Sequence, residues 1–400
     1  MTGFRTGLFL GGVAAAIAAC SADTQSSNES DGASSETTGS SSSDGDDLGG
    51  GRGDTGATGS SAIASATGTT GTTGGAGVDV GAGEGGGSLP GDGSGGEGGQ
   101  SGVEPGTLTA GVWDDNRNFD FFLEYVQGLR QDGLAGLIDL SDDDFGAAHD
   151  FFSMAPGPRQ TLDVSLVIDT TGSMSDEINY LQTEFIAITD AIEERYPNSE
   201  QRWSLVVYRD EGDAYVVDSF DFEDDPAAFQ QHLGAQSADG GGDFPEAPDA
   251  GLARAAELDW RDDGDTARLA FWVADAPHHE QNAQAMVDAI EDLQALDVHV
   301  YPVASSGVDE LTEVTMRSAA QLTGGRYLFL TDDSGVGGAH KEPTIPCYFV
   351  TKLDSAIVRM IDIELSGEYR EPAGDEIIRE GGDPQDRACE LESGQTVEAY

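Results

Sequence analysis

From residue 162 to residue 330, short runs of apolar, often β-branched residues alternate with longer stretches that carry apolar residues at helical spacing. The run 268–274 is apolar almost throughout, which is typical of a strand covered on both faces. This alternation predicts an α/β fold: a doubly wound, mostly parallel sheet with helices on both faces and one antiparallel edge strand at 214–220. The other expected strands are 162–168, 203–208, 268–274, 298–304 and 326–330. The expected helices are 176–196, 226–233, 246–258, 280–296, 309–322 and 350–365.

Oxygen-bearing side chains follow three segments that should end at the same edge of such a sheet. They are Asp169, Thr171 and Ser173 after the first strand, Asp243 and Glu246 after a glycine-rich loop, and Asp275 after the central strand. Ligands of open α/β sheets bind outside the carboxyl ends of the strands. An all-oxygen set suits a hard divalent cation, with Mg²⁺ expected first and Ca²⁺ or Mn²⁺ as alternatives. It lacks the cysteines or multiple histidines of a structural zinc site.

The first of these loops has the pattern Asp-x-Thr-x-Ser, formed by Asp169, Thr171 and Ser173. This pattern resembles the metal-ion-dependent adhesion site of von Willebrand factor A (vWA) domains, whose fold is Rossmann-like. The resemblance covers about residues 160–365, most of the part that should fold. It implies that these three residues bind the metal ion, together with Asp275 after the fourth strand.

The middle loop departs from the commonest pattern of that family, in which a threonine contributes. Its residues Asp243-Phe-Pro-Glu246 are more similar to the integrin β-subunit and hemicentin-like variants, in which a glutamate takes that place. The resemblance therefore implies that Glu246 is a metal ligand and that Asp243 lies outside the ligand shell or beside an adjacent ion.

In this family, a carboxylate from a protein partner completes the metal coordination. The resemblance thus implies a divalent-cation-dependent protein-binding module of adhesion type and not an enzyme. The alternative is a metal-dependent hydrolase or phosphatase that uses Asp169 and Asp275 with His278 and His279, which follow the third loop at the expected rim of the site. These histidines could also bind loop backbone or face solvent. The sequence does not identify the partner or the oligomeric state.

A phosphoaspartyl enzyme is a further alternative, because Asp169-Thr-Thr-Gly-Ser resembles the motif of haloacid-dehalogenase-type phosphatases. Those enzymes need a downstream lysine to stabilise the phosphoryl group. Both lysines of this chain come after the last strand of the alternating region, too late for that role.

The first 19 residues have the features of a bacterial lipoprotein signal peptide: Arg5, an apolar run over 8–19, and then Cys20. The run is too short to span a membrane as a helix. Ile17-Ala-Ala-Cys20 resembles a lipobox, which implies lipidation of Cys20. Ser21 at the next position favours the outer membrane or the cell surface. The alternative is an ordinary signal peptide with an incidental cysteine.

Composition divides the rest of the chain. The first 106 residues hold 31 of the 56 glycines, and the Gly/Ser/Thr/Asp-rich stretch 20–106 is expected to be a disordered tether because it has almost nothing to bury. Residues 107–160 are expected to form a small lead-in segment, 161–366 the vWA domain and 367–400 an acidic C-terminal tail.

The chain carries 74 acidic against 19 basic residues, a formal net charge of −55, and 61 of the acids lie in 107–400. This balance excludes a generic nucleic-acid binder, which needs a basic surface. It also disfavours electrostatic attachment to anionic lipid, so the lipid anchor is the only expected membrane contact. Cys347 and Cys389 are expected to pair, since disulfides suit exported proteins.

Overall fold

The structure is a computed structural model and describes residues 103–152, 157–242 and 244–400. The expected signal peptide, the lipidation site Cys20, nearly all of the expected tether and the candidate site residue Asp243 lie outside the described residues. In the part of the chain that is described, no helix is long and apolar enough to cross a membrane.

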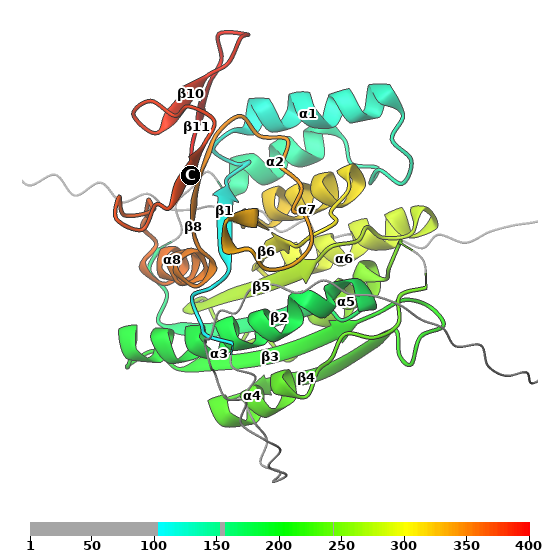
Figure 1. Cartoon of the computed structure of the whole chain (residues 1–400), viewed down its shortest axis with the longest axis vertical. Helices are drawn as coiled ribbons and strands as arrows, with labels where there is room; N and C mark the ends of the chain where they lie inside the picture. The colour runs from blue at the N-terminus through cyan, green and yellow to red at the C-terminus, as the bar shows by residue number, and fades with distance from the viewer. Residues whose placement is uncertain (1–102, 153–156, 243) are drawn as a thin grey trace, which may run out of the picture. The chain divides into compact units, whose positions relative to one another are not determined.

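A nine-stranded sheet lies at the centre of the described residues (Figure 1). Its strands are β1 (Thr109–Trp113), β2 (Thr161–Asp169), β3 (Gln201–Tyr208), β4 (Val217–Glu223), β5 (Thr266–Ala274), β6 (Val298–Ala304), β7 (Tyr327–Leu330), β8 (Tyr348–Lys352) and β9 (Arg379–Gly381). They are arranged in the order β4-β3-β2-β5-β6-β7-β1-β8-β9. Neighbours from β3 to β7 are parallel, and β4 pairs antiparallel with β3. The predicted α/β class with a parallel sheet and an antiparallel edge strand is confirmed.

Helices cover both faces of the sheet. They are α1 (Phe119–Asp132), α2 (Asp142–Phe152), α3 (Ile178–Arg195), α4 (Pro226–Gly234), α5 (Pro248–Ala256), α6 (Ala283–Ala295), α7 (Glu310–Thr323) and α8 (Leu353–Ser366). The side chains of Leu162, Val164, Leu166 and Ile168 on β2 join the core under α3, α4 and α8, whereas Val167 joins the opposite core under α5, α6 and α7. Successive residues of a strand point to opposite faces, so a continuously apolar strand such as β2 can serve two cores.

The expected lead-in segment contributes to the sheet itself. Its strand β1 lies between β7 and β8 and pairs antiparallel with both. Helices α1 and α2 from the same segment pack into the core on the α7 side. A five-residue strand with a glycine at its centre has little periodicity, and Thr109 bonds to Thr331, 222 positions away. Local sequence patterns therefore do not reveal this pairing.

The C-terminal region also contributes strands that the sequence analysis did not expect. Residues 348–352 form strand β8, so the last helix begins at Leu353 and not at Val350 as expected. Strand β9 then pairs with β8, and a small separate sheet is formed by β10 (Ala388–Glu390) and β11 (Thr396–Glu398). A disulfide joins Cys347, next to β8, to Cys389 in β10. Aromatic and β-branched residues in β8 favour a strand over the first turn of a helix.

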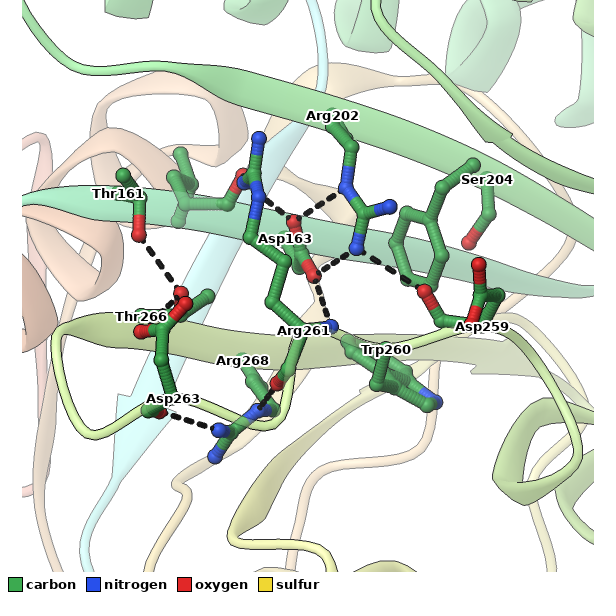
Figure 2. A network of polar contacts seen from close by, with 12 residues as sticks. Thr161, Asp163, Arg202, Ser204, Asp259, Trp260, Arg261, Asp263, Thr266 and Arg268 are labelled. Carbon is green, nitrogen blue, oxygen red and sulfur yellow. Dashed lines mark hydrogen bonds and ion pairs between the residues drawn. The ribbon is translucent and has the colours of Figure 1, made fainter.

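A buried ion-pair network ties the strands together at the end where β2 begins (Figure 2). The Asp163 carboxylate is fully buried and accepts from Arg202 Nε at 3.0 Å, Arg202 Nη2 at 2.6 Å and Arg261 Nη1 at 2.7 Å. It also accepts the backbone N–H of Arg261 at 2.9 Å. Asp163 thus links β2 to β3 and to the loop that precedes β5. These bonds satisfy a buried charge that would otherwise be strongly unfavourable.

At the opposite ends of the strands, a glycine lets helix α5 approach the sheet. A Cβ atom on Gly251 would stand 2.6 Å from Cδ1 of Tyr208, closer than real contacts allow. Because α5 starts two residues after Glu246, this close approach helps to fix the loop that carries Glu246.

Candidate metal centre

The ends of β2 and β5 are aligned, which brings two of the expected ligands to one edge of the sheet. Ile168 on β2 is paired with Val273 on the neighbouring strand β5. Asp169 follows Ile168 by one residue, and Asp275 follows Val273 by two. Asp169 is fully buried and Asp275 nearly so. The sheet therefore places both carboxylates where ligands of α/β folds bind.

The first loop is organised around the Asp169 carboxylate. Its Oδ1 accepts the backbone N–H of Thr171 at 2.9 Å and the Thr171 hydroxyl at 2.7 Å. The Thr171 and Ser173 hydroxyl oxygens are 3.1 Å apart, and a hydrogen bond from Ser173 reaches Asp275. Asp169, Thr171, Ser173 and Asp275 thus form one connected group, as the sequence analysis expected of neighbouring ligands.

Glu246 joins this group through the glycine-rich loop. A Cβ atom on Gly241 would lie 2.9 Å from Glu246 Oε1 and 3.0 Å from Thr171 Cβ, so Gly241 fits between these two side chains. The Glu246 N–H donates to the carbonyl of Pro277, in the loop after Asp275, at 2.9 Å. Glu246 is 3% exposed, which places its carboxyl inside the group and not at its surface.

Each of the three carboxylates keeps one buried oxygen without a hydrogen-bond partner among the described residues: Asp169 Oδ2, Glu246 Oε2 and Asp275 Oδ1. Burial, and then repulsion from Asp275, raises the pKa of Asp169 to about 7. Burial raises the pKa of Asp275 to about 6. Burial and repulsion from Asp169 and other acids raise the pKa of Glu246 to about 9. Unpaired, mutually repelling oxygens in one place are what a bound cation would stabilise.

The donor set combines carboxylates with hydroxyls. Among the described residues, no group of three or more His, Cys, Asp or Glu side chains stands ready to hold a metal ion by itself. Thr171 and Ser173 would have to supply neutral oxygens beside the carboxylates, which is common for Mg²⁺ and Ca²⁺. The contribution expected of Asp243 lies outside the described residues.

The two histidines after Asp275 are engaged in other contacts. His278 is 1% exposed, and its Nε2 lies 3.0 Å from the carbonyl oxygen of Gly136, in the loop between α1 and α2. Burial lowers the pKa of His278. His279 is partly exposed, and its Nε2 lies 2.6 Å from Oδ1 of Asp210. His278 therefore has the loop-backbone bond that the sequence analysis left open, and His279 binds a carboxylate at the end of β3.

Three acidic residues beside the group were not expected in this role. Asp213 accepts the backbone N–H of Gly241 at 2.9 Å, and both Asp210 and Asp213 contribute to the raised pKa of Glu246. Glu177 is buried, accepts the backbone N–H of Ser306 at 3.1 Å and contributes to the raised pKa of Asp275. Asp210 and Asp213 come from a different segment of the chain, so their approach to Glu246 depends on the fold. Nothing in the local pattern around Glu177 indicates burial.

Comparisons with known proteins point to one domain family. Residues 163–335 match the family model described as a von Willebrand factor A domain. An alpha-protein kinase, vwkA, from Dictyostelium discoideum is 23% identical over 131 residues, which cover 32% of this chain and 21% of the kinase. The matched region is thus about a fifth of that relative's length.

Among solved structures, the pilus adhesin SpaC from Lactobacillus rhamnosus GG, in an open conformation, is similar at 12% identity and a TM-score of 0.32. The similarity covers 42% of this chain and 28% of the adhesin. A TM-score of this size supports neither the fold nor a function. The family match, the strand order and the loops at the carboxyl ends of β2 and β5 agree with one another. Residues 163–335 of this chain therefore form a von Willebrand factor A-type domain.

Proposed function

We propose that the vWA-type domain is a divalent-cation-dependent protein-binding module of adhesion type, in which a carboxylate of the partner completes the metal coordination. The observation that carries this proposal is the set of three buried carboxylate oxygens, on Asp169, Glu246 and Asp275, that have no hydrogen-bond partner in the described part of the chain. Mg²⁺ is the first candidate, with Ca²⁺ and Mn²⁺ as alternatives.

The carboxylates and the hydroxyls would have different roles at such a site. Asp169, Glu246 and Asp275 supply the negative charge that retains the ion. Thr171 and Ser173 supply neutral oxygens, which leave the ion enough positive charge to attract an outside carboxylate. We favour a binding module over the hydrolase alternative, because among the described residues no hydrogen bond joins the ring of His278 or His279 to Asp169 or Asp275; the two rings contact Gly136 and Asp210.

We expect Mg²⁺, Mn²⁺ or Ca²⁺ to raise the melting temperature of the full chain, since the ion binds only the folded state. At a concentration one hundred times its Kd, the ion adds about 2.7 kcal/mol to the free energy of unfolding. For a domain of this size that is a rise of about 5–10 °C. Asp169→Ala should abolish the rise, as measured by differential scanning calorimetry with and without the metal.

Asp176→Ala is the matched control, because Asp176 is an exposed acid in the short 3-10 helix that follows Thr171. It should keep the full rise. An equal rise in Asp169→Ala would contradict the site. The open coordination position has its own readout: in the Mn²⁺-loaded protein, an aspartate-containing peptide should lower the proton relaxation rate of water by displacing a metal-bound water. No change at saturating peptide would contradict capture of a partner carboxylate.

The location of the protein is part of the proposal. The lipobox-like sequence before Cys20 supports lipidation and a place in a bacterial cell envelope, at the outer membrane or cell surface. Cells fed a fatty-acid analogue should label the wild-type chain, and Cys20→Ser should remove the label almost completely. Undiminished labelling of Cys20→Ser would show that this cysteine is not the lipid anchor.

A further inference from the structure

A cavity of about 420 Å³ lies between the end of α3, the start of β3 and the turn before α4, and these elements are neighbours in the fold (Figure 1). It shares no residue with the candidate metal centre. Tyr196 after α3, Trp203 on β3 and Pro226 at the start of α4 give it an apolar lining. Aromatic and proline side chains in one groove are typical of surfaces that bind extended peptides.

The indole N–H of Trp203 faces this cavity without a hydrogen-bond acceptor. Trp203 is 2% exposed, and its ring centre lies 5.5 Å from that of Phe229. No described residue accepts from its Nε1, and this nitrogen is not among the fully enclosed polar atoms that lack a partner. The nitrogen is therefore accessible from the cavity that Trp203 lines. A nearly buried indole N–H normally has an acceptor, so a ligand that supplies one would be stabilised here.

Three exposed acids give the cavity a negative charge: Glu193 on α3, Glu200 before β3 and Asp224 before α4. Neither Glu193 nor Asp224 forms an ion pair with a described residue. Glu200 lies 3.9 Å from Nη2 of Arg261, the one basic residue among the described residues that line the cavity. The charge of Arg261 is already offset by the fully buried Asp163, at 2.7 Å (Figure 2). The cavity therefore attracts a cationic ligand.

We propose that this cavity binds an extended basic segment of a partner protein, independently of the metal centre. A backbone carbonyl of the segment accepts from Trp203 Nε1. A proline or another apolar residue of the segment lies on Tyr196 and Pro226. A lysine or arginine pairs with Glu193 or Asp224.

Other classes of ligand satisfy only part of this surface. A simple amine supplies the positive charge but no acceptor for the indole N–H. A neutral sugar supplies acceptors but no positive charge. A metal ion is not favoured, since no group of three or more His, Cys, Asp or Glu side chains in the described part of the chain is arranged to hold one. A basic peptide supplies both the charge and the acceptor, because every residue of its backbone carries a carbonyl.

Isothermal titration calorimetry of the full chain in EDTA, with a capped peptide of alternating lysine and proline, tests the proposal. We expect this peptide to bind, and the same peptide with glutamate in place of lysine to bind at least about tenfold more weakly. The double variant Glu193→Gln, Asp224→Asn should weaken the lysine peptide by about twofold to thirtyfold. Glu194→Gln, exposed on α3 but outside the cavity, is the matched control and should bind as the wild type does.

The indole signal of Trp203 gives a second readout. In ¹H–¹⁵N spectra it should move downfield as the lysine peptide is added, unlike the signals of the other tryptophans. Trp203→Phe identifies this signal by its loss and should weaken binding by about twofold to tenfold, because it removes one hydrogen bond. Glu193 and Asp224 are both exposed, so their double variant should fold even if Trp203→Phe does not.

The proposal is overturned if the lysine peptide does not bind the wild type at millimolar concentration, or if the glutamate peptide binds equally well. Binding that is unchanged in the double variant, or an indole signal that stays in place, would also overturn it. Spermine that binds as tightly as the peptide would overturn the assigned partner class, because it would show that the carbonyl and the apolar residue contribute nothing.

Discussion

Asp163→Ala should lower the free energy of unfolding by about 3–5 kcal/mol, the range measured when one partner of a buried ion pair is removed. Asp163 is fully buried and bonds to both Arg202 and Arg261 (Figure 2). Its loss leaves two guanidinium groups, each less than one fifth exposed, without their carboxylate. At about 2–4 °C for each kcal/mol, the melting temperature should fall by about 10 °C. Urea unfolding followed by circular dichroism measures the change.

Asp259→Ala is the matched control for this network. Asp259 is exposed, and its hydrogen bond with Arg202 is made by its backbone carbonyl, which accepts at 3.0 Å; its charge adds less than Asp163 does to the raised pKa of Arg202. The substitution should therefore change the free energy of unfolding by no more than about 0.5 kcal/mol. A loss below about 1 kcal/mol in Asp163→Ala would show that the two ion pairs only offset the desolvation of their own charges.

The second large effect is the response of stability to pH. In the presence of EDTA, the melting temperature should fall as the pH rises from 5 to 6.5. The pKa values of Asp169, Asp275 and Glu246 in the folded state, about 7, 6 and 9, all lie above the ordinary values for these side chains. In this window the folded state retains protons that the unfolded state has released, so each step up in pH favours unfolding. The loss is on the order of several kcal/mol, because the three groups titrate as a coupled set.

A divalent cation should reverse this trend. Metal ligands must be deprotonated, so the ion binds better at higher pH and replaces the repulsion with attraction. The rise in melting temperature on adding Mg²⁺ or Mn²⁺ should therefore be larger at pH 6.5 than at pH 5. Calorimetric scans at pH 5 and at pH 6.5, each with EDTA and with metal, give the four melting temperatures for this comparison.

Asp169→Asn separates the site from other titrating groups. Asparagine retains an oxygen that can accept from Thr171, but it carries no charge. It should raise the metal-free melting temperature at pH 6.5 and, at the same time, abolish the response to metal. Burial lowers the pKa of His299, but Glu364 and Asp297 outweigh it and raise the pKa to about 9. Above pH 6.5 the loss of this charge would also lower the stability, so the test stays below that pH. A metal-free melting temperature that is flat from pH 5 to 6.5 would contradict the coupling of these carboxyls.

Much of the candidate site could be predicted from the sequence, because its geometry follows from a local rule. Asp169 is the last residue of β2, Thr171 and Ser173 follow it at alternate positions, and Asp275 directly follows a buried strand. Parallel strands end at a common edge, so a sequence that locates the strands also locates these side chains. The same reasoning cannot show that Glu246 is almost fully buried, because that depends on how Gly241 packs against Thr171.

The contacts of the two histidines depend on residues far away in the sequence. The sequence places His278 and His279 one after the other behind Asp275, at an expected rim. Only the tertiary structure separates them, because the carbonyl of Gly136, more than a hundred residues earlier, fills the space beside His278. The ring is buried by a segment that the sequence analysis had interpreted as a lead-in.

By itself, the sequence determined the α/β class, the parallel strands β2, β3, β5, β6 and β7 and the three loops that carry the proposed oxygen ligands, since all of these depend on periodicity and short-range order. Tertiary structure decided the insertion of β1 beside β7, the pairing of β8 with β9 and the burial of Asp163. These features depend on groups far apart in the chain, such as Ala110 and Leu330, that meet only when the sheet assembles. The physical reason is that burial and long-range pairing are properties of the packed molecule, whereas hydrophobic periodicity is a property of each segment.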